Sequence, residues 1–218
     1  MSSAGDVERP GAERWVPERH TLSALRSAAA SCHGCELWRD ARHVVFSQGR
    51  ASAGIMLVGE QPGDHEDTTG EPFVGPAGRL LDEALEAAHI DRESTYLTNA
   101  VKHFRHHVSG KRRIHDKPEV GNIVACHPWL EAEFDVVRPR VVVCLGATAV
   151  RAVLGRPIPI SRARGQRFDG PDAAPDAAVF VTTHPSAVLR LRGKEGFDEA
   201  FDRFVGDLEA AGSAAHEG

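Results

Sequence analysis

The stretch IMLVGEQPG, residues 55–63, indicates the fold of this chain. Its first four residues are all apolar, which is typical of a strand buried on both faces of a parallel sheet. Gly59 ends this run and begins a glycine-rich turn that reaches Gly63. Turns of this kind after a strand let the backbone approach a ligand closely. The stretch therefore predicts a central strand followed by a ligand-binding loop.

Three further segments, at residues 96–98, 140–145 and 178–183, repeat the apolar pattern. Between them the apolar residues recur with helical spacing, most clearly over 77–89 and in the last helix from residue 197. We also expect a helix over 129–137, with Pro128 in its first turn. Buried strands alternating with helices predict an α/β fold, a three-layer α/β/α sandwich with a central four-stranded parallel sheet. Ligands bind such sheets at the carboxyl ends of the strands.

The 218 residues suit one domain, which we expect over residues 20–211, with flexible tails at 1–19 and 212–218. The polar first twenty residues lack the apolar centre of a secretory signal, and the longest apolar run is too short to span a bilayer. We therefore expect a cytoplasmic protein without a membrane partner, and nothing suggests more than a monomer. The net charge of -5 means that any nucleic acid must bind a local basic patch.

The cysteines suggest a metal centre. Cys32 and Cys35 form a C-x-x-C motif, which suits zinc, an iron–sulfur cluster or a redox pair. Cys126 is a third candidate ligand, whereas Cys144 lies inside an apolar run and is interpreted as a small buried side chain. His103 follows a strand and is the candidate fourth ligand, because imidazole also binds iron–sulfur clusters.

Two charged segments and one histidine are the other candidates for function. The acidic loop around Glu60 and Asp64 suits a cationic transition state, although a solvated acidic loop has the same composition. Lys111, Arg112 and Arg113 lie in a basic segment that predicts phosphate binding, with a plain surface loop as the alternative. His184 directly follows a predicted strand, where it could reach a cleft or simply cap a helix.

Taken together, these motifs resemble the uracil-DNA glycosylase superfamily, specifically its iron–sulfur family 4 and, within that family, the UdgX type. The resemblance covers roughly residues 20–210. The matching motifs, in chain order, are GEQPG at 59–63, PFVGPAG at 72–78, Thr98-Asn99, KRRIH at 111–115 and HPS at 184–186. The KRRIH segment matches the insertion that distinguishes the UdgX type and is the most specific of them.

The resemblance implies excision of uracil from DNA, preferably single-stranded. It implies that Phe73 stacks on the flipped base and that the Asn99 amide reads its edge. His184 would donate to a uracil carbonyl oxygen, Glu60 would stabilise the sugar cation, and Gln61 would restrict water. The substrate-binding set also includes Gly59, Gly63 and Asp64.

In the UdgX type, the loop histidine attacks the anomeric carbon and stays bound to the abasic site. By resemblance this histidine is His115, while Lys111, Arg112 and Arg113 hold the loop or contact phosphates. The segment from His103 to Lys111 is shorter than in typical UdgX sequences, which bears on the reach of His115. The alternatives are a conventional turnover glycosylase and a non-catalytic module that binds single-stranded or abasic DNA.

The resemblance also extends to the metal centre. Family 4 enzymes have Val-Lys-Cys where this chain has Val101-Lys102-His103, and UdgX proteins have the same histidine. It therefore implies a 4Fe–4S cluster held by Cys32, Cys35, His103 and Cys126. A zinc-stabilised structural protein is the remaining alternative.

Overall fold

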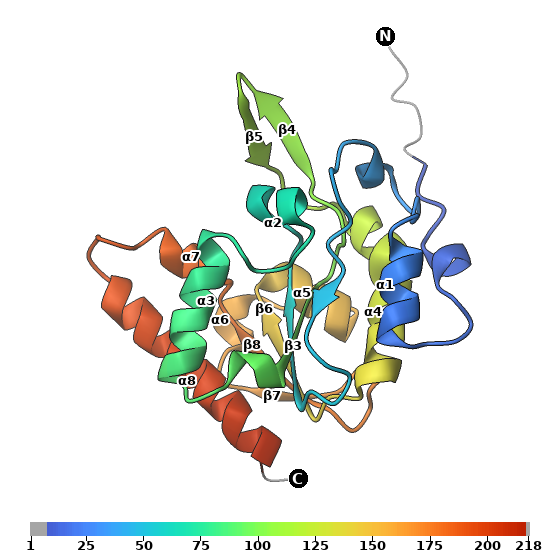
Figure 1. The fold of residues 1–218 in the computed structure, drawn as a ribbon. Helices are drawn as coiled ribbons and strands as arrows, with labels where there is room; N and C mark the ends of the chain where they lie inside the picture. The colour runs from blue at the N-terminus through green and yellow to red at the C-terminus, as the bar shows by residue number, and fades with distance from the viewer. Residues whose placement is uncertain (1–7, 217–218) are drawn as a thin grey trace.

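A computed structural model describes residues 8–216, which form a sheet covered by helices on both faces (Figure 1). The main sheet has six strands in the order β1-β3-β2-β6-β8-β7, and β4 and β5 form a separate hairpin. The strands are β1 (Ser47–Gln48), β2 (Ile55–Gly59), β3 (Thr95–Asn99), β4 (His106–Ser109), β5 (Arg112–His115), β6 (Val141–Leu145), β7 (Arg167–Asp169) and β8 (Ala178–Thr182).

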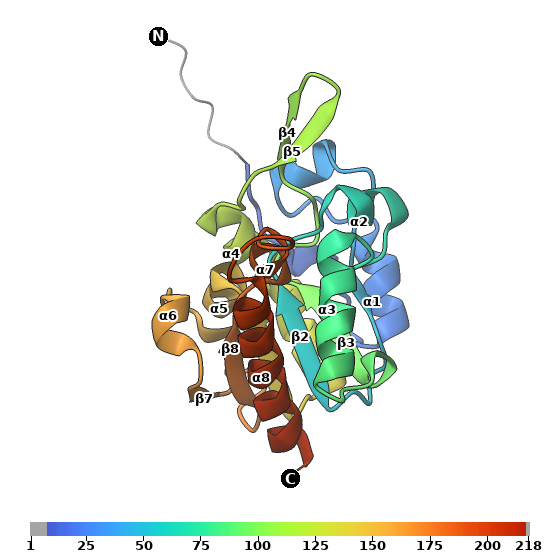
Figure 2. The same ribbon diagram turned by 90° about the vertical axis from the view of Figure 1, so that its left-hand side faces the viewer.

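The helices divide between the two faces of the sheet. They are α1 (Leu22–Ala29), α2 (Asp64–Thr69), α3 (Pro76–Ala87), α4 (Val120–Val137), α5 (Ala147–Leu154), α6 (Ile160–Ala163), α7 (Pro185–Leu189) and α8 (Phe197–His216), with short 3-10 helices η1 (Glu13–Trp15), η2 (Glu36–Arg39) and η3 (Arg92–Ser94). Helices α3, α7 and α8 lie on one face, where α8 crosses the sheet, and α1, α4 and α5 lie on the other (Figure 2).

Strand β2 shows why the central strands are apolar throughout. Ile55 and Leu57 point into the core shared with α3 and α8, while Met56 and Val58 point into the core shared with α4 and α5. All five residues of the strand are buried. Because successive side chains of a strand point to opposite faces, a strand covered on both sides needs apolar residues at every position.

The predicted α/β/α sandwich is confirmed, but the sheet is larger than the four parallel strands expected. Strands β3, β2, β6 and β8 are parallel and form its centre. The edge strand β1 pairs antiparallel with β3, and β7 pairs antiparallel with β8, so the six-stranded sheet is mixed. The two edge strands have only two and three residues and are partly exposed, so they lack the apolar run that marks a buried strand.

Helix α4 also differs from the prediction, because it begins at Val120 and contains Pro128 in its interior. The helix starts where the Glu119 N–H donates to the Asn122 side chain, 2.9 Å away. Proline lacks the N–H that would have donated to the Val124 carbonyl. Val124 lies on the solvent side of the helix, 65% exposed, so water can hydrate that carbonyl.

Both predicted tails make specific contacts with the rest of the domain where they are described. The Gly11 N–H donates to the Gly34 carbonyl at 3.0 Å and the Ala12 N–H to the Ala125 carbonyl at 2.8 Å. These bonds join the N-terminal segment to α4 and to the loop from Cys32 to Cys35, which we call the cysteine loop. At the other end, α8 continues to His216 with Ala215 buried. Residues 1–7 and 217–218 of the predicted tails lie outside the described part. Among residues 8–216, no helix is both long and apolar enough to cross a membrane.

Candidate functional site

A cavity of about 540 Å³ opens at the carboxyl ends of the four parallel strands. Each central strand contributes to it, as parallel sheets lead one to expect. The predicted site residues that line it are Glu60, Gln61 and Gly63 after β2, Phe73 before α3, Asn99 at the end of β3, His115 at the end of β5 and His184 after β8. Residues separated by up to 124 positions in the chain therefore meet in one cavity.

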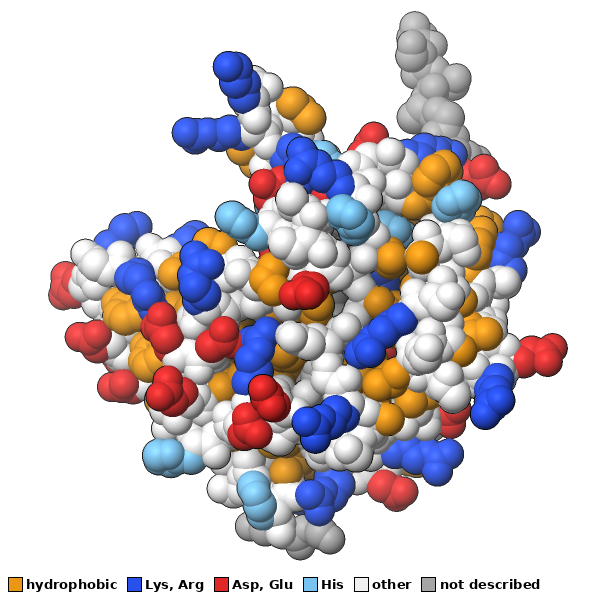
Figure 3. Space-filling view, in the orientation of Figure 1, with side chains coloured by type: hydrophobic (Ala, Val, Ile, Leu, Met, Phe, Trp, Pro, Cys, Tyr) orange, Lys and Arg blue, Asp and Glu red, His pale blue; other side chains and the backbone are white. Residues whose placement is uncertain are grey.

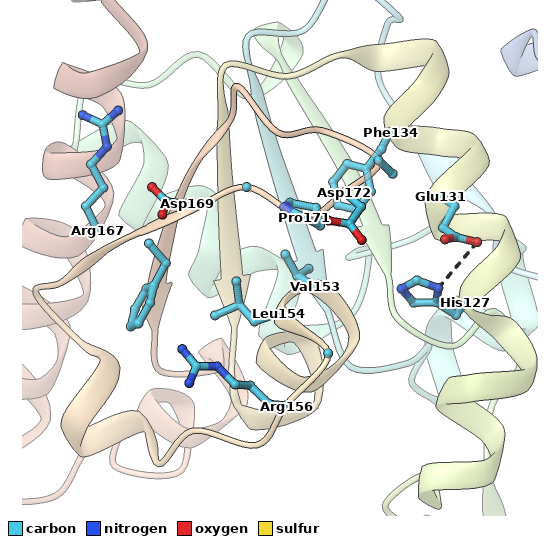
Figure 4. A pocket seen from close by; sticks show the side chains of 14 residues that line it. His127, Glu131, Phe134, Val153, Leu154, Arg156, Arg167, Asp169, Pro171 and Asp172 are labelled. Carbon is cyan, nitrogen blue, oxygen red and sulfur yellow. Dashed lines mark ion pairs between the residues drawn. The ribbon is translucent and has the colours of Figure 1, made fainter.

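A second hollow, of about 530 Å³, lies between α4, the end of α5 and β7 (Figure 4). It contains none of the predicted site residues. Its side chains include Arg156, Arg167 and an ion pair between His127 and Glu131, 3.7 Å apart. This mixture of scattered charges shows no convergence on a common point in Figure 4, so the first cavity is the candidate site.

Phe73 and Asn99 line one side of the cavity, where the Phe73 ring offers a flat aromatic surface. Phe73 has a φ of 57°, a left-handed conformation that is strained for an aromatic residue and is common at functional sites. Gly59 allows Phe73 and Asn99 to approach the β2 backbone, because a Cβ at position 59 would clash with the Asn99 amide oxygen and lie 2.7 Å from Phe73 Cζ. A Cβ on Gly78 would likewise clash with the Phe73 carbonyl. These glycines keep the ring and the amide in place.

His184 presents a neutral hydrogen-bond donor. Burial lowers its pKa to about 4, so the imidazole is uncharged at neutral pH. Its Nδ1 atom accepts the Ser186 N–H at 3.2 Å as the N-cap of α7. A neutral imidazole that accepts at Nδ1 carries its proton on Nε2. His184 therefore offers the Nε2–H group to a ligand oxygen.

Glu60 and His115 form a carboxylate–imidazole pair at the mouth of the cavity. Oε1 of Glu60 lies 3.5 Å from Nε2 of His115, and the Thr148 hydroxyl donates to the other carboxylate oxygen. The His115 side chain is 47% exposed and that of Glu60 22%, so both are accessible to a large ligand. A carboxylate in this position can accept an imidazole proton or stabilise a cationic centre.

Gln61 fastens the β4–β5 hairpin that carries His115. Its side-chain nitrogen donates to the Arg105 and Asp116 carbonyls, each at 3.1 Å, and its side-chain oxygen accepts the Arg105 N–H at 3.1 Å. Arg105 and Asp116 are the residues that flank the two strands of the hairpin. The Gln61 amide is therefore used to close the base of the hairpin, which the sequence did not indicate.

The three predicted loop cations fall into two groups. The Arg113 guanidinium contacts Asp64 and the fully buried Asp67, each at 2.5 Å, so it holds the hairpin against α2. Asp64 is half exposed in this ion pair and does not line the cavity. Lys111 and Arg112 are exposed at the tip of the hairpin, which projects from the body with its cationic side chains (Figure 3).

The cysteine loop lies beside α4, and the sulfur atoms of Cys32, Cys35 and Cys126 are of the kind that binds a metal or an iron–sulfur cluster. Burial raises the pKa of Cys35 to about 11 and that of Cys126 to about 12, and neighbouring thiols act in the same direction. Cys32 accepts the Trp129 ring N–H and Cys126 the Lys102 N–H, each at 3.3 Å. The buried thiols of Cys32 and Cys126 thus accept N–H donors, as the sulfur ligands of an iron–sulfur cluster do.

The fourth predicted ligand and the spare cysteine have different surroundings. His103 is 7% exposed, and burial lowers its pKa to about 4, which leaves the imidazole neutral as a metal ligand must be. Cys144 is buried in β6 and is part of the hydrophobic core. Among residues 8–216, no three His, Cys, Asp or Glu side chains are close enough together to hold a single metal ion. A four-iron cluster spreads its ligands more widely than a single ion does.

Sequence reasoning missed several residues of the site. Glu66 accepts the Gly63 N–H at 3.1 Å and the Gly75 N–H at 2.9 Å, and it thereby ties together the two loops that line the cavity. Its position three residues after Gly63 is the spacing of a capping box, which could have revealed it. Thr148 and Arg190 reach the site only through the tertiary fold.

Comparison with known proteins gives a family match. The family model described as the uracil DNA glycosylase superfamily matches residues 46–209. A type-4 uracil-DNA glycosylase of Thermotoga maritima is 36% identical over 175 residues, which cover 80% of this chain and 86% of that protein. One from Pyrobaculum aerophilum is 32% identical over 197 residues, covering 84% and 97%. One from Sulfurisphaera tokodaii is 32% identical over 174 residues, covering 78% and 76%.

Proposed function

This chain belongs to the uracil-DNA glycosylase superfamily, and from that premise we propose that it cleaves the N-glycosidic bond between uracil and deoxyribose in DNA. The observation that carries the proposal is the composition of the cavity. An aromatic ring, an amide, a neutral imidazole donor and a carboxylate line one space. These are the groups needed to bind a flat base, receive it as an anion and stabilise the cation left behind.

Uracil recognition is assigned to Phe73 and Asn99. A nucleotide must leave the base stack to reach the cavity, and this costs less in single-stranded DNA. The Phe73 ring would stack on the extruded base, while the Asn99 amide can both donate to and accept from its Watson–Crick edge. Asn99 is 2% exposed, so a base that could not pair with it would leave a buried amide unsatisfied.

Bond cleavage places negative charge on uracil and positive charge on the sugar. The bonding electron pair leaves with uracil N1, and the Nε2–H of His184 would donate to the carbonyl oxygen that takes up this charge. His184 would act here as a neutral donor, because burial lowers its pKa to about 4 and keeps the imidazole uncharged at neutral pH. Glu60 would stabilise the oxocarbenium-like sugar from the other side.

We propose further that His115 captures the sugar cation. One ring nitrogen forms a bond to the anomeric carbon, Glu60 accepts the imidazole proton, and the uracil anion takes its proton from water. The 3.5 Å separation of Glu60 and His115 supports this assignment, since Glu60 is the carboxylate nearest to the imidazole in the cavity. Gln61 supports it through the hairpin base, which keeps His115 over the cavity and restricts access of water.

The DNA strand is expected to run past the hairpin. Lys111 and Arg112 are free of ion pairs within the described residues and are exposed at the tip, where they can contact phosphates. Arg113 is engaged with α2, so it contributes to DNA binding through the position of the hairpin. We propose uracil-containing single-stranded DNA as the preferred partner.

We propose a 4Fe–4S cluster at Cys32, Cys35, His103 and Cys126. When bound, the cluster would cross-link the N-terminal segment to α4, and excision needs no electron transfer from it. The buried thiols and their N–H donors support this ligand set. Burial raises the pKa of the Cys35 and Cys126 thiols, so the protein without such a group would keep these two thiols protonated.

The test is a denaturing gel of the purified protein with a uracil-containing single-stranded oligonucleotide, beside His115→Ser and Glu60→Gln. We expect a covalent band for wild type, no such band for His115→Ser, and strongly reduced excision for Glu60→Gln. Wild type that releases an alkali-cleavable abasic product without a covalent band would be a conventional turnover enzyme. Neither product from a folded protein would favour a non-catalytic DNA-binding module, and an unchanged rate for Glu60→Gln would contradict the role of Glu60.

A further inference from the structure

A fully buried ion pair lies directly behind the base-binding end of β3. Nζ of Lys102 is 2.6 Å from Oε2 of Glu133, and the two side chains are 1% and 0% exposed. Lys102 follows β3 by three residues, and Glu133 is on α4. Neither residue lines the cavity, and the proposed mechanism uses neither.

The ammonium group directs two of its three donors to the segment that carries Asn99. Besides Glu133, it donates to the Thr98 hydroxyl at 2.6 Å and to the Asn99 backbone carbonyl at 3.0 Å. The other Glu133 oxygen accepts the Tyr96 hydroxyl at 3.0 Å and the Thr98 hydroxyl at 2.8 Å. Three residues of β3 are thereby held to α4 by one polar network.

The same segment also contacts the turn that carries Glu60. The Ala100 N–H donates to the Gly59 carbonyl at 2.9 Å, and the Val101 N–H donates to the Glu60 carbonyl at 3.0 Å. The Lys102 N–H donates to Cys126 at the segment's end. Residues 99–102 thus connect the base-reading amide, the backbone of the catalytic carboxylate and one cysteine of the proposed cluster.

Burying two charges does not by itself stabilise a protein, because the loss of hydration offsets their attraction. Well-packed neutral residues in place of such a pair often leave stability unchanged or raise it. A lysine in this position has a clearer use as a three-donor anchor. It holds the Asn99 carbonyl in one direction, which sets the peptide from which the Asn99 side chain extends.

We propose that Lys102 is a positioning residue for uracil recognition, with Glu133 as its counter-ion, so that the pair holds Asn99 in register with the base. This inference rests on the proposed function, since Asn99 is assigned to uracil there. The base-reading amide is buried and cannot adjust freely to a misplaced base. Its backbone must therefore be fixed by the protein before uracil arrives.

The test compares wild type with Lys102→Met/Glu133→Gln, a double variant that removes both charges while keeping similar side-chain sizes and the Glu133 acceptor for Tyr96. The matched control is Arg164→Met/Asp207→Asn, which removes a partly buried ion pair outside the cavity. For each protein we would measure the melting temperature, the affinity for free uracil by calorimetry, and the single-turnover rate on uracil- and cytosine-containing oligonucleotides.

We expect the double variant to melt near the wild-type temperature and to bind uracil more weakly. Excision should be roughly a hundredfold slower, which is the size of effect that a misplaced substrate or catalytic group produces. Its preference for uracil over cytosine should fall, while the control keeps wild-type uracil affinity. A stable double variant with wild-type affinity and rate would overturn the inference and make the pair purely structural. Wild type that neither binds nor excises uracil would instead overturn the proposed function, and the inference with it.

Should the double variant not fold, Lys102→Arg answers the same question. It retains the charge beside Glu133 but changes the direction of the donors. We expect a folded protein with weakened uracil affinity, and an unchanged affinity would overturn the inference.

Discussion

On the proposed capture mechanism, Gln61→Ala should shift the reaction from covalent capture of the abasic product toward its release. The substitution removes three hydrogen bonds between the Gln61 amide and the base of the hairpin, all at 3.1 Å. At about 1 kcal/mol of net stabilisation for each bond, the closed position of the hairpin loses about 3 kcal/mol. That corresponds to up to roughly a hundredfold in the population that places His115 over the cavity. Water would then compete for the sugar cation.

The assay is single-turnover reaction with a uracil-containing oligonucleotide, with covalent and free abasic products separated on one denaturing gel. We expect total excision to change less than the ratio of covalent to free product. Gln61→Glu keeps the size of the side chain but turns a carboxylate toward two carbonyl oxygens, so its ratio should fall at least as far. Gln166→Ala changes an exposed glutamine of the loop after α6 and is the control. An unchanged ratio in Gln61→Ala would refute the reasoning.

Three further predictions concern the cavity wall, the cysteines and pH. Gly59→Ala adds a Cβ that clashes with the base-binding side chains, and overpacking of about 1–3 kcal/mol should weaken uracil binding by roughly 5- to 150-fold in calorimetry. Gly206→Ala in α8, where a Cβ meets nothing within 4 Å, should leave binding unchanged. Cys126→Ala should remove the visible absorbance of the proposed cluster from the purified protein, whereas Cys144→Ala should retain it. Because burial lowers the pKa of His184 from 6.5 to about 4, the unfolded chain binds the extra proton between these values. The melting temperature should therefore fall as the pH drops through this range, and it should fall less in His184→Asn.

Local patterns were sufficient to predict the centre of the fold. The four central strands and α3 were predicted because runs such as residues 55–58 and stripes such as 80, 81, 84 and 85 reflect burial directly. Strands β1 and β7 were not, because a two- or three-residue edge strand is defined by its partner. Helix α4 was placed too late because Pro128 is typical of a first turn, and only its exposed surroundings make it acceptable inside the helix.

For the site, too, local motifs predicted one part and tertiary contacts decided the other. Motifs such as GEQPG and HPS indicate which residues belong to it, since each lies at the end of a predicted strand, and the order of the strands brings them together. The hydrogen-bond partners of each polar side chain were decided by residues distant in the chain. Gln61 was expected to restrict water at the reacting centre, and that role stays a prediction. The structure adds that its amide closes the base of a hairpin through Arg105 and Asp116, which lie 44 and 55 positions along the chain.

The sequence by itself determined the α/β class, the family to which the motifs belong and most of the predicted residues that line the cavity, because these depend on periodicity and on short motifs. Only the tertiary structure decided the pairing of Glu60 with His115, the engagement of Arg113 with α2 and the burial of Lys102 against Glu133. The physical reason is that hydrogen bonds and ion pairs act over a few ångströms in space. Their partners here are 31 to 55 residues apart in the chain, and no local pattern encodes that distance.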